Sequence, residues 1–169
     1  MDAKQIVQMQ IAAAWRTSDG ATSDITNELL NWTPPGTANP ISATLAHIIG
    51  GEDLFVQTVI QGKPRIWEAG KWGEKIGVDV LPRPGAGWEE YRGRELSISP
   101  FKTYQEVVRA ATNSYLETIS PEELERRVNF AGRELSVAGV LVMLVIHITE
   151  HAGEVATLKG IQGAKGLPM

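Results

Sequence analysis

The chain contains three histidines, His47, His147 and His151, and these are its strongest candidates for chemistry. His147 and His151 are four residues apart, a spacing that places two side chains one turn apart on the same face of an α-helix. Two imidazoles in that arrangement can bind a single cation. A buried histidine is also often an ordinary core residue, and periodicity alone does not place His47 beside the pair. Gly51, one turn after His47, is expected to leave room beside that ring.

Three neutral imidazoles around a divalent ion would leave coordination positions open for water or substrate, as in catalytic rather than structural zinc sites. Such an ion lowers the pKa of bound water toward ~7 or binds an incoming thiolate. The chain has no cysteine, so it offers no thiolate nucleophile of its own, and only a carboxylate could close the site as a fourth ligand. Sites rich in histidine bind several divalent metals, so the residues alone leave zinc, nickel, manganese and iron open.

Several carboxylates lie near the histidines in the sequence, and each has two interpretations. Glu52, Asp53 and Glu154 could orient a metal-binding imidazole through its second ring nitrogen, or they could be ordinary helix-surface charges. Glu150 completes the sequence His-Ile-Thr-Glu-His, which matches the H-x-x-E-H pattern of inverted zincin proteases. Adjacent helical positions differ by roughly 100°, so we expect Glu150 to face away from the pair, toward solvent or a partner subunit. The protease is the less favoured interpretation.

Apolar residues recur at three- and four-residue steps in four long segments, and no segment shows a clear alternating pattern. This predicts an all-α protein, a four-helix bundle in which inward side chains on facing helices could build a metal site. We expect one domain over residues 1–169. The predicted helices run from Ala3 to about Leu30, from Ser42 to Ile60, from Thr103 to Ile119 and from Ser136 to about Ile161, with a short helical turn from Ser120 to about Arg127. Residues 32–40 and 128–134 are predicted connections.

The segment between Pro64 and Pro100 is long, irregular and rich in glycine and proline. A loop of this length in a compact domain is typically functional, and we expect it to cover the bundle and partly close a pocket. Its aromatic residues could line the pocket mouth or simply pack on the core: Trp67, Trp72 and Trp88. Four arginines beside them are candidates to pair with a substrate carboxylate: Arg65, Arg83, Arg92 and Arg94.

Composition excludes several classes of function. A net charge of −4 and a pI near 5.4 give no general attraction for nucleic acid or anionic lipid. The longest apolar run, Val137 to Ile148, is shorter than the roughly 20 residues that cross a bilayer. The start of the chain lacks the pattern of a signal peptide, so with no cysteine we expect a cytoplasmic protein. Nucleotide-binding loops and the G-x-S-x-G pattern of serine hydrolases are absent from the sequence.

Two segments resemble motifs of the DinB family of metalloenzymes. Residues 43–53, Ala-Thr-Leu-Ala-His-Ile-Ile-Gly-Gly-Glu-Asp, resemble its helix-two motif, a histidine after Leu-x with an acidic residue about five positions on. Residues 147–158 resemble its last-helix motif, His-x3-His followed by a polar turn and an apolar continuation. The order and spacing of the motifs also match, and the resemblance covers nearly the whole chain.

This resemblance implies an up-down-down-up four-helix bundle in which His47, His147 and His151 bind a divalent metal, with zinc or nickel the first choices. It also implies a homodimer, and characterised relatives include thiol-dependent transferases and isomerases. We therefore expect a metal-dependent enzyme that acts by hydrolysis or thiol transfer on a small molecule, possible substrates including low-molecular-weight thiols. The alternative is a non-catalytic stress-response or interaction bundle with a vestigial or structural site. The sequence assigns no catalytic residue.

Overall fold

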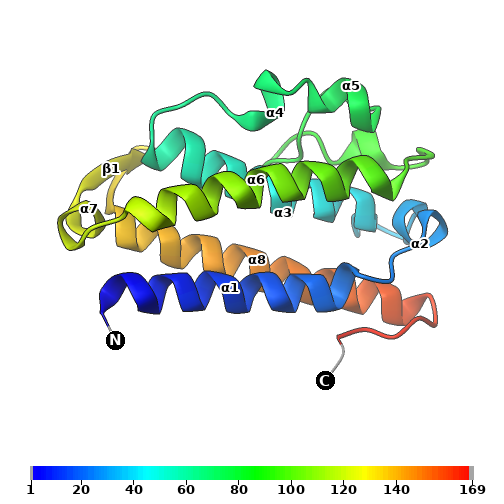
Figure 1. The fold of residues 1–169 in the computed structure, drawn as a ribbon. Coiled ribbons are helices and arrows are strands. Elements are labelled where there is room, and N and C mark those ends of the chain that lie inside the picture. Colours follow the sequence, from blue (N-terminus) through cyan, green and yellow to red (C-terminus); the bar gives the residue numbers. More distant parts are fainter. Residues whose placement is uncertain (1, 168–169) are drawn as a thin grey trace.

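The computed structural model describes residues 2–167 and is a bundle of four long helices (Figure 1). Helix α1 (Ala3–Thr22) packs along α8 (Val137–Ile161), and α8 also packs against α3 (Ile41–Asp53), which in turn contacts α6 (Ile98–Thr118). A two-stranded hairpin is the only sheet within these residues. The predicted all-α helical bundle is therefore confirmed.

Helix α8 is the central element, because it contacts both α1 and α3. It begins where the sequence predicts, with the hydroxyl of Ser136 accepting a hydrogen bond from the Gly139 N–H at 3.1 Å. Its length and composition alone would also allow it to cross a membrane. Val140, Leu144 and Ile148 are fully buried, so one face of this helix forms part of the protein core.

The first predicted helix is wrong in its extent, because α1 ends at Thr22 rather than near Leu30. A separate short helix, α2 (Asn27–Asn31), begins where the Thr26 hydroxyl accepts from the Leu29 N–H at 3.3 Å. Between the two helices, the buried ammonium of Lys159 on α8 pairs with Asp24 and donates to a carbonyl at the end of α1. This contact stabilises the non-helical connection between Thr22 and Asn27, so α1 and α2 do not form one continuous helix.

The second long helix begins one residue before the predicted cap. Pro40 occupies the N-cap position, whereas Ser42 is fully buried inside the helix, so the predicted Ser42 cap is wrong. After Asp53 the helix continues as a π-helical stretch, η1 (Leu54–Ile60). The expected end near Ile60 is thus confirmed.

The third long helix starts earlier than predicted. Ser97 caps α6, and the hydroxyl of Thr103, the predicted cap, instead donates to the Ser99 carbonyl at 3.2 Å. The predicted short turn after this helix is present as α7 (Pro121–Glu125). The predicted connection over 128–134 belongs to a hairpin of β1 (Arg127–Phe130) and β2 (Arg133–Ser136). Its two turn residues both have positive φ, 52° and 80°, as in the tight turns that match strand twist.

Residues 64–97, called the covering segment below, lie over α3 and α6 and hold three short helices (Figure 1). These are α4 (Ile66–Ala69), α5 (Trp72–Ile76) and a 3₁₀ turn, η2 (Glu89–Tyr91). Trp67 and Trp72 are buried with their ring centroids 5.6 and 5.2 Å from that of Tyr104 on α6. For these two tryptophans, the core-packing interpretation is the correct one.

Asp53 fastens the covering segment to the bundle. Its fully buried carboxylate accepts hydrogen bonds from the Ile66 N–H at 3.0 Å, the Trp67 N–H at 2.9 Å and the Tyr104 hydroxyl at 2.7 Å. The two backbone donors are at the start of α4, where a helix leaves N–H groups without internal partners. One side chain of α3 therefore joins α4 and α6.

Replacing Asp53 by alanine is expected to lower the free energy of unfolding by about 3 kcal/mol, because three donors would lose their buried acceptor. The matched variant Tyr104→Phe removes one of the three bonds and should cost about 1 kcal/mol. Urea unfolding followed by circular dichroism measures both values. Equal losses in the two variants would show that the bonds to α4 do not stabilise the protein.

Candidate metal centre

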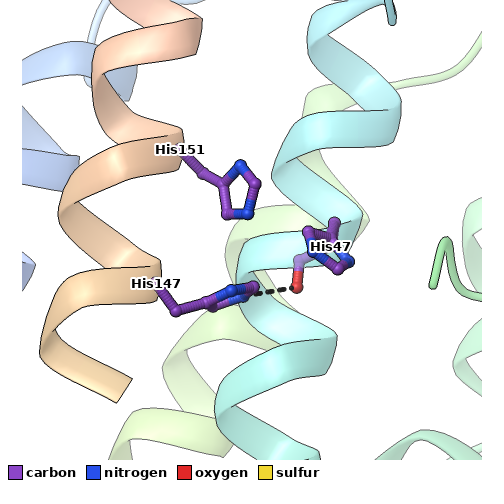
Figure 2. Close-up of side chains that lie close together, drawn as sticks. All are labelled: His47, His147 and His151. Carbon is purple, nitrogen blue, oxygen red and sulfur yellow. Dashed lines mark hydrogen bonds between the residues drawn. The ribbon is translucent and has the colours of Figure 1, made fainter. Parts of the chain in front are cut away.

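The three histidines meet where α3 faces α8 (Figure 2). Each pair of imidazole rings has a centroid separation of 4.7 Å. One ring nitrogen from each residue lies within 4.8 Å of the other two. The structure thus brings together His47, His147 and His151, the residues predicted as metal ligands, from positions a hundred residues apart.

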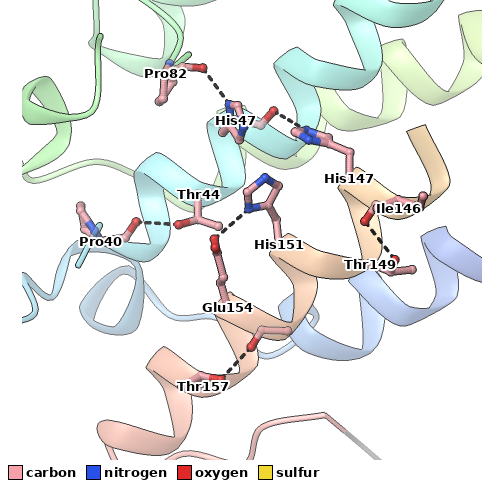
Figure 3. A network of polar contacts seen from close by, with 11 residues as sticks. Pro40, Thr44, His47, Pro82, Ile146, His147, Thr149, His151, Glu154 and Thr157 are labelled. Atoms are coloured by element: carbon pink, nitrogen blue, oxygen red, sulfur yellow. Dashed lines mark hydrogen bonds and ion pairs between the residues drawn. The ribbon is translucent and has the colours of Figure 1, made fainter. Parts of the chain in front are cut away.

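Hydrogen bonds orient two of the rings through their Nδ1 atoms (Figure 3). Nδ1–H of His47 donates to the carbonyl of Pro82 at 2.8 Å, and Nδ1–H of His151 donates to the carboxylate of Glu154 at 2.8 Å. Because each acceptor can only accept, these tautomers leave the Nε2 lone pair of both rings free. A partner on the second nitrogen is the usual support of a metal-binding histidine.

His147 fits against α3 because the facing residue is a glycine. Its Nε2 lies 3.2 Å from the backbone carbonyl oxygen of His47. A Cβ atom built on Gly51 would lie 2.2 Å from that same nitrogen, far inside van der Waals contact. Gly51 was expected to make room for the His47 ring; the ring it accommodates is that of His147.

The preceding glycine has a similar role toward the covering segment. A Cβ atom on Gly50 would lie 2.7 Å from a methyl group of Leu81. Leu81 precedes Pro82, the residue that accepts from His47. Trp88, in the same part of the segment, has its ring centroid 4.7 Å from that of His47 and donates from Nε1 to the Arg83 carbonyl at 2.8 Å. Of the three predicted pocket tryptophans, Trp88 is therefore the one at the site.

Burial keeps the two more enclosed imidazoles uncharged. Burial, together with the smaller effect of the neighbouring His47 and His151, lowers the pKa of His147 to about 4. Burial also lowers the pKa of His47, against the opposing effect of its bond to Pro82. Both rings are accordingly neutral near pH 7, which is the form that binds a metal.

The cluster fits a divalent ion after a small adjustment. Zinc–nitrogen bonds of about 2.0–2.1 Å in a tetrahedral site place ligand nitrogens roughly 3.4 Å apart, so nitrogens that lie within 4.8 Å of one another need to approach by at most about 1.4 Å. Within residues 2–167, the group that could hold a metal consists of the three histidines without a fourth His, Asp or Glu. A bound ion would keep at least one position for another ligand.

The other carboxylates do not contact the imidazoles. Glu52 is buried and accepts from Nε1 of Trp15 at 2.9 Å and from the Thr112 hydroxyl at 2.7 Å. Burial raises its pKa. With Asp53 bound to the covering segment, only Glu154 of the three suggested residues orients an imidazole. Glu150 is exposed on α8, as expected, and lies outside the cluster, so the arrangement of an inverted zincin is not formed.

The predicted role of the arginines finds no support at the cluster. Arg92 donates to the backbone carbonyls of Ala38 and Pro34 at 2.6 and 3.0 Å and so fixes the loop before α3. Nε of Arg94 donates to the Glu90 carbonyl at 3.1 Å. Arg65 and Arg83 line a separate groove on the covering segment.

The model of the DinB superfamily matches residues 10–155 of the chain, a span that includes all three histidines. The chain belongs to the DinB superfamily. The resemblance seen in the two sequence motifs is thereby confirmed. A comparison with curated proteins found no match.

Solved structures show the same DinB-like fold. A conserved protein from Enterococcus faecalis has a TM-score of 0.77 at 20% identity, over 96% of this chain and 99% of that one. The DinB-like protein YjoA from Bacillus subtilis has a TM-score of 0.62 at 19% identity, over 98% and 96%. The sibling lethal factor precursor DfsB has a TM-score of 0.57 at 14% identity, over 97% and 99%. At these identities the comparison establishes the fold alone.

Gly51→Ala is expected to weaken binding of a divalent ion at least about tenfold, because the new methyl group would displace the His147 ring. Competition with a chromophoric zinc chelator measures this affinity. Gly160→Ala is the matched control: it is another glycine-to-alanine change in a bundle helix, and its Cβ would meet open space. Its affinity should equal that of the wild type, and an equal affinity for Gly51→Ala would contradict the steric argument.

The metal-free protein is expected to lose stability as the pH falls from about 6.5 toward 4. The unfolded chain protonates His147 near its ordinary pKa of 6.5, whereas the folded chain does so only near 4. Within that window the unfolded state binds more protons, so acid favours unfolding. Urea titrations across the window should give a shallower pH dependence for His147→Ala than for the wild type. Identical slopes would refute the lowered pKa.

Proposed function

We propose that this protein is a metal-dependent enzyme with one divalent ion bound by His47, His147 and His151, acting on a small molecule by hydrolysis or thiol transfer. The observation that supports it best is the convergence of three imidazoles, two of them with Nδ1 already hydrogen-bonded and Nε2 free. A merely structural core cluster does not need that arrangement. Zinc or nickel is the proposed ion.

When bound, the ion would supply a Lewis acid that acidifies water or binds a thiolate. The chain's own residues would do the positioning. The Pro82 carbonyl and the Glu154 carboxylate fix the tautomers of His47 and His151, and Gly51 gives His147 its place. Trp88 packs against the His47 ring and would hold it in place.

The site suits small substrates, because the covering segment packs directly against the His47 ring. Low-molecular-weight thiols are a proposed substrate class, on the basis of family membership and of an ion that three neutral ligands leave electrophilic. The homodimer remains a prediction.

Protein purified without a polyhistidine tag is expected to contain about one divalent ion per chain, as measured by elemental mass spectrometry. His47→Ala, His147→Ala and His151→Ala should each lose it, since two imidazoles bind an ion far more weakly than three. Full occupancy in His151→Ala would overturn the proposed site. A wild-type chain that stays metal-free even after reconstitution would favour the non-catalytic bundle.

Glu154→Ala should weaken metal affinity about tenfold, because His151 would lose the acceptor that holds its tautomer. Glu150→Ala is the matched control, one turn earlier on the same helix and outside the cluster, and should leave the affinity unchanged. Chelator competition compares the two variants. If both changes weaken binding equally, general electrostatic attraction rather than the bond to His151 explains the effect.

A further inference from the structure

A groove of about 540 Å³ lies next to the metal centre, between the start of α3 and the C-terminal half of α8. Thr44 on α3 and Glu154 and Thr157 on α8 line it. Figure 3 shows Thr44 and Glu154 beside His151, with Thr157 farther along α8. Thr44 precedes His47 by three residues and Glu154 follows His151 by three, so these two lining positions are about 4.5 Å along their helix axes from the histidine positions. Its volume is typical of sites for small molecules.

The chemistry of the lining selects for one sign of charge. Among the described residues that line the groove, Glu154 is the only charged one. Its carboxylate is used on one side only: Oε2 accepts from His151, and within residues 2–167 no donor is hydrogen-bonded to Oε1. A cationic donor in the groove could form a hydrogen bond to Oε1 of Glu154. An anion would be repelled by this carboxylate, because no cationic residue lines the groove within residues 2–167.

The rest of the lining is suited to an apolar group. Ala38, Leu158 and Ile161 contribute hydrocarbon, and Ile161 is 63% exposed although it is a large aliphatic side chain. Gly153 leaves the wall of α8 open, because a Cβ atom built there would meet nothing within 4 Å. Apolar walls with a few polar groups at one end are the usual composition of a small-molecule site.

We propose that this groove binds a small molecule with an ammonium group on an apolar body, its ammonium paired with Glu154 at the end nearest the three histidines and its apolar body along Leu158 and Ile161. This inference names a ligand class for the proposed enzyme. Only the reaction of that ligand rests on the proposed function, because the groove is lined by protein residues and does not need the metal ion to bind it. Glu154 then serves two partners at once, the ligand and His151.

The test uses two probes of similar size and opposite charge, 2-phenylethylamine and 3-phenylpropanoate. Titrations of ¹⁵N-labelled protein followed by NMR give the affinity of each probe and locate it through the amide of Gly153. The amine should bind at least about tenfold more tightly than the carboxylate. Equal binding of the two probes would overturn the proposal.

Matched leucine variants on α8 test the location. Gly153→Leu places a side chain into the groove and should weaken amine binding about tenfold, as should Glu154→Gln, which removes the charge but keeps an oxygen for His151. Gly160→Leu makes the same change at a position that does not line the groove, and should bind like the wild type. Unchanged binding in Gly153→Leu would refute the location.

Metal-free and zinc-loaded protein separate this proposal from the proposed function. We expect the amine to bind to both forms. Binding to the zinc-loaded form alone would mean that the amine coordinates the ion directly, and would overturn the proposal that it binds in the groove. Gly153→Leu should keep the metal content of the wild type. A chain that binds the amine but never a metal would refute the enzyme and leave the groove, whereas a metal-binding chain indifferent to the amine would refute the groove alone.

Discussion

At Gly51, α3 and α8 approach so closely that any side chain on α3 would occupy the space of the His147 ring. The site depends on this approach. It brings the His47 carbonyl within 3.2 Å of His147 and lets rings from two helices share one small volume. Gly50 has the same effect one residue earlier, where it admits Leu81. Two consecutive glycines thus accommodate both the opposite helix and the covering segment.

The residues that follow these glycines keep the bundle in register around them. Glu52 is hydrogen-bonded to α1 and α6, and Asp53 to α4 and α6. Neither contacts an imidazole, although each carboxylate follows His47 closely in the sequence. Buried carboxylates are costly unless their hydrogen bonds are made, so these contacts hold the helices in one mutual arrangement. The positions of the three histidines therefore depend on Glu52 and Asp53, which lie outside the site.

Much of this could be predicted from the sequence. The periodicity gave four long helices, and His-x3-His placed two rings on one face, since both patterns depend on local geometry alone. What failed depended on tertiary contacts: α1 ends early because Lys159, far along the chain, binds beside its last turn. The Thr103 capping pattern lay inside a helix that Ser97 had already begun. The acceptor of His47 is a backbone carbonyl on an irregular segment, and no residue type signals such a group.

His47 belongs to two contacts at once, since its ring donates to the covering segment and its carbonyl accepts from α8. An ion on its Nε2 would therefore be thermodynamically linked to the docking of residues 80–88 on the bundle. By reciprocity, whatever loosens those residues must weaken the binding of the ion, and the ion must in turn reduce the population of their locally open state and so the exchange of their amide hydrogens. Ligand access and metal retention would then be opposed, because an opening wide enough to admit a ligand beside Trp88 would also release a support of the metal.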